Sequence, residues 1–253
     1  MQDSNHVSTP FDSQTKVENF ENNKILNDIP YKEAIGCLMF LAMVSRPDIS
    51  YSVGVLSRYS DKPTQAHWNC VKRVIKYLKG TCSYGLIFGK NDLSKDAQFL
   101  AYSDADFAGD LITRRSTSGC LVKFGKDLIS WSSRRQRCVA LSITESEFIA
   151  ACATVQQLVW LDNLMRDLIT HDLKMPVLYV DNQSTIKIIK NPQFHCRTKH
   201  IDYKYKYIRE KYHEGWFLIE YVSSKGQQAD ILTKGLAKPC FERLRDDISM
   251  RVL

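Results

Sequence analysis

The sequence lacks a long apolar run, paired cysteines and a signal sequence, and each absence excludes a class of protein. Its longest apolar stretch, Ile35–Val44, is far shorter than the ~20 residues that a bilayer-spanning helix needs, so we expect no membrane segment. The eight cysteines occur singly and never at CxxC spacing, which argues against a disulfide framework. We therefore expect free thiols and an intracellular location.

The sequence also has fewer acidic than basic residues. The chain of 253 residues has 35 lysines and arginines against 28 aspartates and glutamates, a net charge of +7. The basic residues concentrate at Arg114–Arg115, Arg134–Arg137 and Arg197–Lys211. A basic excess favours a polyanionic partner such as nucleic acid, although many proteins with this charge bind none.

Three parts of the chain differ in composition and periodicity. Residues 1–29 are polar, with apolar residues too sparse for a packed face, and we expect this segment to be disordered. Residues 30–92 have apolar side chains every three or four positions, punctuated by Pro47 and Pro63, which predicts a small helical region. Residues 97–248 begin with a strand-like period of two, which predicts a second domain of a different kind.

The pattern in this second domain predicts an α/β fold. We expect three consecutive strands at 98–104, 119–124 and 128–133, then a long helix at 144–168. Thr144 and Glu147 have the spacing of a capping box at the start of that helix. A strand at 177–180, helices at 184–190 and 201–213, a strand at 217–222 and a last helix from 227 complete the order. This order requires a mixed five-stranded sheet with flanking helices.

Four acidic residues in this order can form a metal site. Asp104 ends the first strand, Asp181 follows the fourth, Glu147 lies at the start of the long helix and Asp230 lies in the last helix. If the first and fourth strands are parallel neighbours, both aspartates emerge at one edge, where the helix adds its carboxylate. Mg²⁺ prefers oxygen ligands, and two ions about 3.5–4 Å apart can be held by three or four carboxylates and a substrate phosphate.

Each acidic residue also has an ordinary structural explanation. Aspartates at strand ends are common in turns, Glu147 can serve only as a capping partner, and Asp230 can be a solvated helix residue. The joint placement of all four is what favours a metal site.

Six short motifs follow one another along residues 102–234. They are Tyr102-Ser-Asp-Ala-Asp-Phe-Ala-Gly109, Arg115-Ser-Thr-Ser-Gly119, Ser142-Ile-Thr-Glu-Ser-Glu-Phe148, Val180-Asp-Asn-Gln183, Lys199-His-Ile-Asp202 and Ala229-Asp-Ile-Leu-Thr-Lys234. In this order they resemble the ribonuclease H region of copia-type retrotransposon Pol polyproteins. Upstream, Tyr31-x-x-x-Ile-Gly-x-Leu and Ser45-Arg-Pro-Asp-Ile49 resemble the thumb and connection at the end of the same family's reverse transcriptase. The resemblance covers residues 30–248.

The resemblance implies a ribonuclease H-like fold that uses two Mg²⁺ ions, with Mn²⁺ as the alternative metal. The family's catalytic and metal-binding carboxylates carry over onto Asp104, Glu147, Asp181 and Asp230. Asp104 is preferred to Asp106 because it closes the strand, whereas Asp106 lies in the following turn. Glu147 is preferred to Glu145 because it heads the apolar run Phe148–Ala151, which leaves Glu145 as a cap or a solvated residue.

Further residues are expected to contact nucleic acid. Between positions 199 and 212, lysines and arginines interleave with tyrosines, a mixture suited to phosphate contacts and base stacking. A solvated amphipathic helix with its tyrosines packed inward explains this pattern equally well. The residues expected at the nucleic acid are Asn182, Gln183, Arg115, Ser116, Lys199, His200, Lys204 and Arg209. For Asn182 and Gln183, a role at the start of a helix is an equal alternative.

The function implied by the resemblance is hydrolysis of the RNA strand of RNA–DNA hybrids during reverse transcription, in cytoplasmic virus-like particles. The expected partners are the hybrid, the polymerase region of the reverse transcriptase and other element-encoded proteins. Polymerase activity is not expected, because no Tyr-x-Asp-Asp motif is present.

Two other interpretations remain. Cellular enzymes of the superfamily place a histidine in the loop before the last acidic residue, whereas residues 222–229 contain none; copia-type members commonly lack it too. A catalytically inactive, nucleic-acid-binding remnant of a truncated or decayed polyprotein is the main alternative, because no polymerase Tyr-x-Asp-Asp motif precedes the connection-like helices. Another nuclease of the superfamily, such as an integrase, is disfavoured by the order and spacing of the six motifs.

Overall fold

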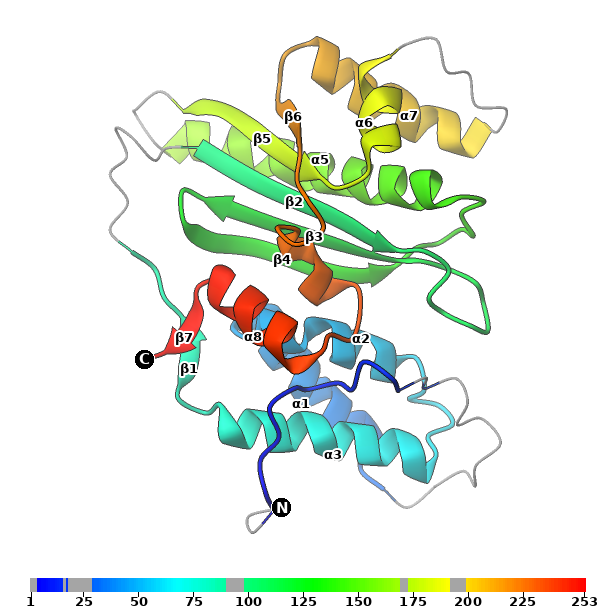
Figure 1. Ribbon diagram of the computed structural model, residues 1–253, viewed down its shortest axis with the longest axis vertical. Helices are drawn as coiled ribbons and strands as arrows, with labels where there is room; N and C mark the ends of the chain where they lie inside the picture. Colours follow the sequence, from blue (N-terminus) through cyan, green and yellow to red (C-terminus); the bar gives the residue numbers. More distant parts are fainter. Residues whose placement is uncertain (1–3, 16, 18–28, 90–97, 169–172, 192–198) are drawn as a thin grey trace.

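A five-stranded mixed sheet forms the centre of the protein (Figure 1). The computed structural model describes residues 4–15, 17, 29–89, 98–168, 173–191 and 199–253, and the side chains of 199–205 lie outside that description. The strands, in spatial order, are β4 (Asp127–Arg135), β3 (Thr117–Phe124), β2 (Gln98–Asp106), β5 (Lys174–Val180) and β6 (Leu218–Tyr221). β2, β3 and β4 are antiparallel, whereas β5 runs parallel to both β2 and β6. The mixed α/β sheet expected from the sequence is confirmed.

Both faces of this sheet are covered, because successive strand side chains point to opposite sides. In β3, Cys120 and Val122 belong to one buried cluster, whereas Leu121 between them belongs to another. Phe99 and Ala101 of β2 join the cluster of Cys120 and Val122. The sheet therefore separates two hydrophobic cores.

The first core lies under α5 (Ile143–Leu168), α6 (Gln183–Lys190) and α7 (Lys199–His213), which lie on one side of the sheet in Figure 1. The start of α5 differs from the expected capping box. The hydroxyl of Ser142 accepts a hydrogen bond from the Glu145 N–H at 3.1 Å, and the Glu145 carboxylate accepts one from the Leu141 N–H at 2.8 Å. The caps of α5 are therefore Ser142 and Glu145, which leaves the side chain of Glu147 available for another role.

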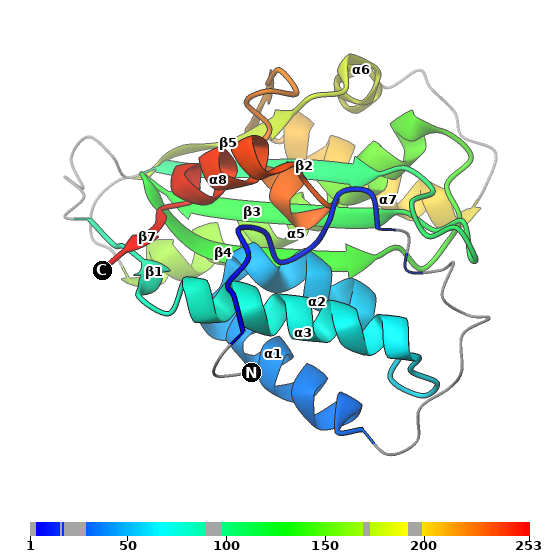
Figure 2. The ribbon, with the colours of Figure 1, turned by 60° about the horizontal axis from the view of Figure 1, so that its bottom comes forward.

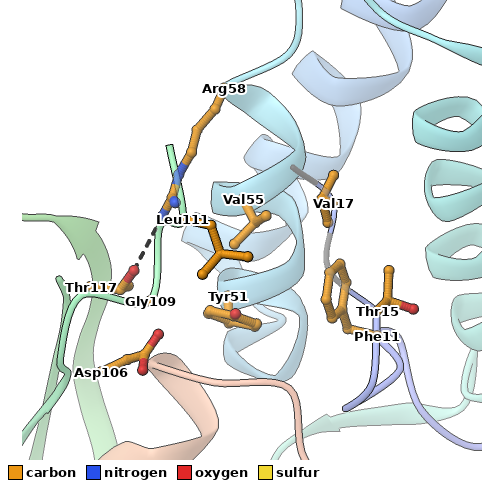
Figure 3. A pocket seen from close by; sticks show the side chains of 10 residues that line it. All are labelled: Phe11, Thr15, Val17, Tyr51, Val55, Arg58, Asp106, Gly109, Leu111 and Thr117. Atoms are coloured by element: carbon orange, nitrogen blue, oxygen red, sulfur yellow. Dashed lines mark hydrogen bonds between the residues drawn. The ribbon is translucent and has the colours of Figure 1, made fainter. Parts of the chain in front are cut away.

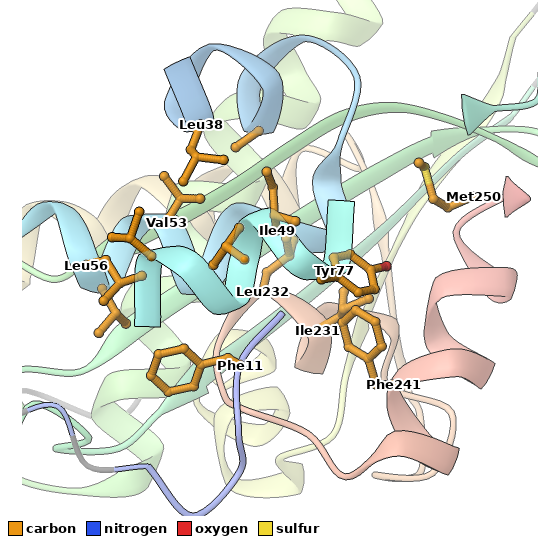
Figure 4. Packing of buried hydrophobic residues seen from close by; sticks show 14 of the residues in the cluster. Phe11, Leu38, Ile49, Val53, Leu56, Tyr77, Ile231, Leu232, Phe241 and Met250 are labelled. Carbon is orange, nitrogen blue, oxygen red and sulfur yellow. The ribbon is translucent and has the colours of Figure 1, made fainter. Parts of the chain in front are cut away.

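The second core joins the N-terminal helical region to the opposite face of the sheet (Figure 2). This region consists of α1 (Tyr31–Val44), the 3₁₀ turn η2 (Pro47–Ile49), α2 (Ser50–Ser57) and α3 (Gln65–Gly80). Leu38, Ile49 and Leu56 pack in one cluster with Leu232 and Phe241 from the C-terminal part of the chain (Figure 4). The two parts of the chain share a core, while the expected three-part division of residues 1–29, 30–92 and 97–248 stays a prediction.

The prediction of one continuous last helix from residue 227 is wrong, because the structure has two separate elements there. A 3₁₀ turn, η3 (Gln228–Leu232), is followed by the separate helix α8 (Lys238–Asp247). Pro239 lies in the first turn of α8, the helical position that tolerates a residue without an N–H. A further strand, β7 (Met250–Val252), follows α8 and pairs with the short strand β1 (Tyr84–Leu86), which lies within the region of residues 30–92 that was expected to be helical.

The N-terminal segment is packed where it is described. Phe11 is 6% exposed and Val17 is 2% exposed, although this segment was expected to have no packed face. The ring of Phe11 meets Tyr51 of α2 edge-on at 5.7 Å, and both line a small pocket that also contains Asp106 and Leu111 (Figure 3). A few apolar side chains are enough to attach a polar segment when a preformed hydrophobic surface is available.

The expectations of no membrane segment and of free cysteines concern the whole chain, but the structure bears on them only within the described residues. Within them, no helix is long and apolar enough to span a bilayer. The cysteines described there are all free.

Candidate active site

Three carboxylates meet at one end of the sheet. Asp104 lies near the end of β2, Asp181 directly follows β5, and Glu147 lies in the second turn of α5. β2 and β5 are parallel neighbours, with Tyr102 opposite Tyr179, so both strands deliver their aspartates to the same edge. One oxygen from each of the three side chains lies within 4.8 Å of the others. The structure therefore brings together three of the four acidic residues expected from the sequence.

The fourth, Asp230, reaches the site through a lysine. Asp230 lies in η3, and its carboxylate is 2.9 Å from the ammonium nitrogen of Lys234. The same nitrogen is 3.8 Å from a carboxylate oxygen of Asp104. The hydroxyl of Thr233 donates a hydrogen bond to that Asp104 carboxylate. Asp230 is thus beside the three-carboxylate group but is paired with a cation of the protein itself.

The two acidic residues that the sequence argument set aside lie elsewhere. Asp106 lines the pocket that contains Phe11 and Leu111 (Figure 3). Glu145 is the capping residue of α5, one of the two roles expected for it. The catalytic roles of the preferred residues, Asp104 and Glu147, remain predictions, but their positions are those that a shared metal site requires.

Burial and mutual repulsion dominate the electrostatics of the site. Burial, followed by the charges of Asp104 and Asp181, raises the pKa of Glu147 to about 9. Burial and the charge of Asp104 raise the pKa of Asp230 to about 7, and the same two causes raise the pKa of Asp181. The carboxylates therefore resist being charged together unless a cation joins them.

One oxygen of Glu147 supports a metal-binding role. The carboxylate of Glu147 accepts a backbone hydrogen bond from Ala105, but its Oε2 atom is buried with no hydrogen-bond partner among the described residues. Buried polar atoms are nearly always partnered by protein, water or an ion. An unpartnered carboxylate oxygen beside two other carboxylates matches the oxygen-rich coordination that Mg²⁺ and Mn²⁺ accept. The residues present therefore fit a divalent cation.

We expect the metal-free protein to lose stability as the pH rises. Glu147 and Asp230 have higher pKa values in the folded chain than in the unfolded chain, so the folded state holds more protons between them. Their contribution to stability is complete at acidic pH and is lost as the pH passes about 7 and then about 9. A divalent ion that binds the folded chain opposes this loss. At a hundred times its Kd it raises the free energy of unfolding by about 2.7 kcal/mol, which corresponds to roughly 5–11 °C in Tm.

Thermal melts in EDTA and in Mg²⁺, at pH 6 and pH 9, measure this effect. The gain from Mg²⁺ should be larger at pH 9, and Glu147→Gln should remove most of the pH dependence seen in EDTA. A Tm in EDTA that is higher at pH 9 than at pH 6 contradicts the expectation.

A buried glutamine fixes the loop that lacks a histidine. Gln227 is fully buried; its Nε2 atom donates to the Ser103 carbonyl at 2.9 Å, and its Oε1 atom accepts from the Ala229 N–H at 3.2 Å. Ser224 of the same loop donates to the Asp181 carboxylate at 3.3 Å. The loop is therefore attached to β2 and to the site by side chains that the sequence analysis did not select.

Thr233 and Lys234 were also missed, although both belong to a motif that was recognised. They lie three and four residues after Asp230, and both of their N–H groups point to the Asp230 carbonyl. Side chains at this spacing lie on the same side of a helical turn as residue 230. Their spacing from Asp230 could therefore have indicated that both side chains lie beside the site.

Gly119 allows η3 to approach the sheet. Gly119 pairs with Asp104 across β2 and β3, and a Cβ atom there would lie 2.9 Å from the Ala229 carbonyl oxygen and 2.7 Å from the Thr233 Cγ2 atom. We expect Gly119→Ala to push η3 away, to destabilise the protein by about 1–3 kcal/mol and to weaken any function of the site. Chemical denaturation measures the stability.

Gly36→Ala is the matched control for this substitution, because a Cβ atom at Gly36 in α1 meets nothing within 4 Å. It should leave stability unchanged or raise it by up to about 1 kcal/mol, since alanine is the better helix former. Equal effects of the two substitutions contradict a specific role for Gly119.

The residues expected to contact nucleic acid have varied positions. Asn182 caps α6 by accepting from the Thr185 N–H at 2.9 Å, and the Ser116 hydroxyl accepts from the Ala108 N–H at 3.1 Å. Arg209 donates to the Ile188 carbonyl at 2.9 Å and so ties α7 to α6. Gln183 is exposed, and Arg115 is partly exposed. The side chains of Lys199, His200 and Lys204 lie outside the described residues, so the nucleic-acid contacts stay a prediction.

The strand order, the flanking helices and the carboxylates at the ends of β2 and β5 define a ribonuclease H-like domain. Two solved structures are similar to the chain at low sequence identity. LC11-RNase H1 from compost is 12% identical with a TM-score of 0.42, covering 58% of this chain and 97% of that one. A foamy viral protease–reverse transcriptase in complex with an RNA/DNA hybrid is 13% identical with a TM-score of 0.47, covering 82% of this chain and 26% of that one.

Sequence relatives identify the family, although no protein-family model matches the chain. The retrovirus-related Pol polyprotein from transposon TNT 1-94 of Nicotiana tabacum is 38% identical over 256 residues, covering 99% of this chain. The corresponding polyprotein from transposon RE2 of Arabidopsis thaliana is 38% identical and covers 96%. Secreted RxLR effector protein 161 of Plasmopara viticola is 46% identical over 136 residues, covering 54% of this chain and 94% of that protein.

The chain therefore belongs to the family of retrovirus-related Pol polyproteins of copia-type transposons, as its motifs indicated. It spans 19% and 16% of the lengths of the two polyproteins.

Proposed function

We propose that this chain is a metal-dependent endonuclease that hydrolyses the RNA strand of RNA–DNA hybrids during retrotransposon reverse transcription. The observation that carries the proposal is the convergence of Asp104, Glu147 and Asp181, whose oxygens lie within 4.8 Å at the ends of two parallel strands. Supporting it are the unpartnered oxygen of Glu147, the net charge of +7 and the homology to Pol polyproteins.

The chemistry divides between the ions and the protein. Divalent ions, Mg²⁺ or Mn²⁺, supply water activation and charge stabilisation when bound at the carboxylates. The protein holds the ligands in place: Ser224 orients Asp181, and Thr233 orients Asp104. Hydrolysis breaks the bond between phosphorus and the 3′-oxygen, adds water to the phosphorus, and leaves a 3′-hydroxyl and a 5′-phosphate.

The substrate would be recognised by its shape rather than by its bases. A single active site acting on many sequences must read the backbone, and the 2′-hydroxyl is what distinguishes RNA from DNA at a given position. Within an intact element the activity would operate beside the polymerase region of the reverse transcriptase and other element-encoded proteins, in cytoplasmic virus-like particles.

A panel of labelled substrates tests the proposed function. The purified chain with Mg²⁺ should cleave the RNA of an RNA–DNA hybrid and leave duplex DNA, duplex RNA and single-stranded RNA intact. Hybrid binding that weakens with salt but gives no cleavage would instead support the inactive remnant. Cleavage of duplex DNA would indicate a different nuclease of the superfamily.

A further inference from the structure

The four acidic residues of the site, Asp104, Glu147, Asp181 and Asp230, form a carboxylate cluster that also contains the ammonium group of Lys234. The inference about this lysine rests on the proposed function. The ammonium nitrogen of Lys234 is 2.9 Å from Asp230 and 3.8 Å from Asp104. The Asp104 and Asp230 side chains are only 3% and 10% exposed, whereas the Lys234 side chain is 42% exposed. The lysine therefore enters a buried pair of carboxylates from the solvent side.

This contact differs from the other lysine pairs in the described chain. Lys206 and Glu210 on α7, for example, lie 3.6 Å apart with both side chains more than half exposed. Pairs of that kind are screened by water and contribute little. Lys234 faces partners that are shielded from water, and the attraction between opposite charges is stronger there.

The cluster is consequently divided into two unlike halves. Asp104, Glu147 and Asp181 offer converging oxygens, and Glu147 also has the unpartnered Oε2 atom. On the other side, Asp230 and Asp104 already share the ammonium group of Lys234. A metal ion can join the first half without displacing any protein cation, whereas an ion between Asp104 and Asp230 must compete with Lys234.

We propose that Lys234 is a resident counter-cation that makes the two metal-binding steps unequal. The first ion binds at Asp104, Glu147 and Asp181. The second binds at least about tenfold more weakly, because it must displace the ammonium group from Asp104 and Asp230. Lys234 also holds Asp230 beside the cluster before any metal arrives.

Fixed geometry makes the lysine a positioning residue. The N–H groups of Thr233 and Lys234 both donate to the Asp230 carbonyl, at 3.2 and 3.3 Å, so the three residues form one tight turn. From that turn, Thr233 reaches Asp104 through its hydroxyl and Lys234 reaches both aspartates through its ammonium group. Displacement of the ammonium group needs only a change in side-chain rotamer, because the lysine side chain is partly open to solvent.

Calorimetric titration of metal-free protein with Mn²⁺ tests this inference without measuring cleavage. For the wild-type chain, the Kd of the first Mn²⁺ ion should be at least about tenfold lower than the Kd of the second. Lys234→Gln should lower the Kd of the second ion by about tenfold and that of the first by less. Lys234→Arg should keep the wild-type ratio of the two Kd values. Lys238→Gln is the control, because Lys238 is 60% exposed and pairs with Glu242 at 4.0 Å, away from the cluster.

The possible results separate this inference from the proposed function. Two equal steps in the wild-type chain, or unchanged steps in folded Lys234→Gln, would overturn the role of Lys234 alone. A wild-type chain that binds no Mn²⁺ would overturn the proposed function itself. If Lys234→Gln fails to fold, the ratio of the two wild-type steps and the result for Lys234→Arg still decide the question.

Discussion

Replacement of Asp181 by asparagine is expected to lower hybrid cleavage at least a hundredfold, given that even the loss of a residue that only supports a metal ligand typically costs about 10–100-fold. The asparagine side chain would keep the shape of the aspartate and can still accept the hydrogen bond from Ser224. It would replace one of the three carboxylates whose oxygens lie within 4.8 Å of one another with a neutral amide, which is a weaker metal ligand. The loss should therefore be in metal binding and cleavage rather than in folding.

The stability of the same variant supplies an internal check. Asp181 raises the pKa of Glu147 by repulsion, so its neutralisation should leave the metal-free protein at least as stable as the wild type. Asp167→Asn is the matched control, since Asp167 is an exposed residue of α5 far along the helix from Glu147. Single-turnover cleavage that is equal in Asp181→Asn and Asp167→Asn contradicts the assigned role.

The largest effect on stability is expected at Asp48, in the helical region. Arg46 forms two hydrogen bonds with the Asp48 carboxylate, at 2.9 and 2.8 Å, and both side chains are buried. Arg46 also donates to the carbonyl and hydroxyl of Thr81, and the Tyr77 hydroxyl donates to Asp48 at 2.6 Å. Asp48→Ala removes the counter-charge of a buried guanidinium and the acceptor of a buried hydroxyl, which should lower the free energy of unfolding by about 3–5 kcal/mol.

Urea denaturation measures that cost directly. The exposed pair of Lys32 and Asp61 provides the control, because Asp61 is 93% exposed and Asp61→Ala should change stability by less than about 1 kcal/mol. A second variant, Arg46→Met with Asp48→Leu, removes both charges and should recover part of the loss. Similar losses for Asp48→Ala and Asp61→Ala would show that the buried network contributes little.

This network explains a motif that the sequence presented only as a resemblance. Ser45-Arg-Pro-Asp-Ile49 places Arg46 and Asp48 on either side of Pro47, which begins η2. The partners Tyr77 and Thr81 come from α3 and its C-terminal cap, about thirty residues away in sequence. Periodicity predicts the helices, but it contains no information about a polar contact between their ends.

The sheet was more predictable than the elements around it. The change to a period of two and the polar turns between the strands are local signals, so β2 to β5 were predicted in the right order and close to their observed bounds. The division of the last helix into η3 and α8 was not foreseen, nor was the burial of Phe11. Both depend on tertiary packing: η3 lies against Gly119, and Phe11 lies against Tyr51.

The candidate site was predictable to the extent that strand ends determine it. Asp104 and Asp181 meet because β2 and β5 are parallel neighbours, a pairing that the sequence argument took as a condition and the structure confirms. Glu147 was chosen over Glu145 because it heads the apolar run Phe148–Ala151, but the cap at Ser142 and Glu145, which leaves the Glu147 side chain available, was found only in the structure. Gln227 could not be assigned from periodicity, and Thr233 and Lys234 only by their spacing from Asp230, since the contacts of all three depend on where η3 lies against the sheet.

Cleavage of a hybrid labelled in its RNA strand, measured with Mg²⁺ and with EDTA, tests the central claim most directly. The carboxylate site predicts RNA fragments with 3′-hydroxyl ends in Mg²⁺ and intact RNA in EDTA, with the hybrid bound in both conditions. Intact RNA in Mg²⁺ and in Mn²⁺, with the hybrid still bound, would contradict the claim and leave a protein that only binds nucleic acid.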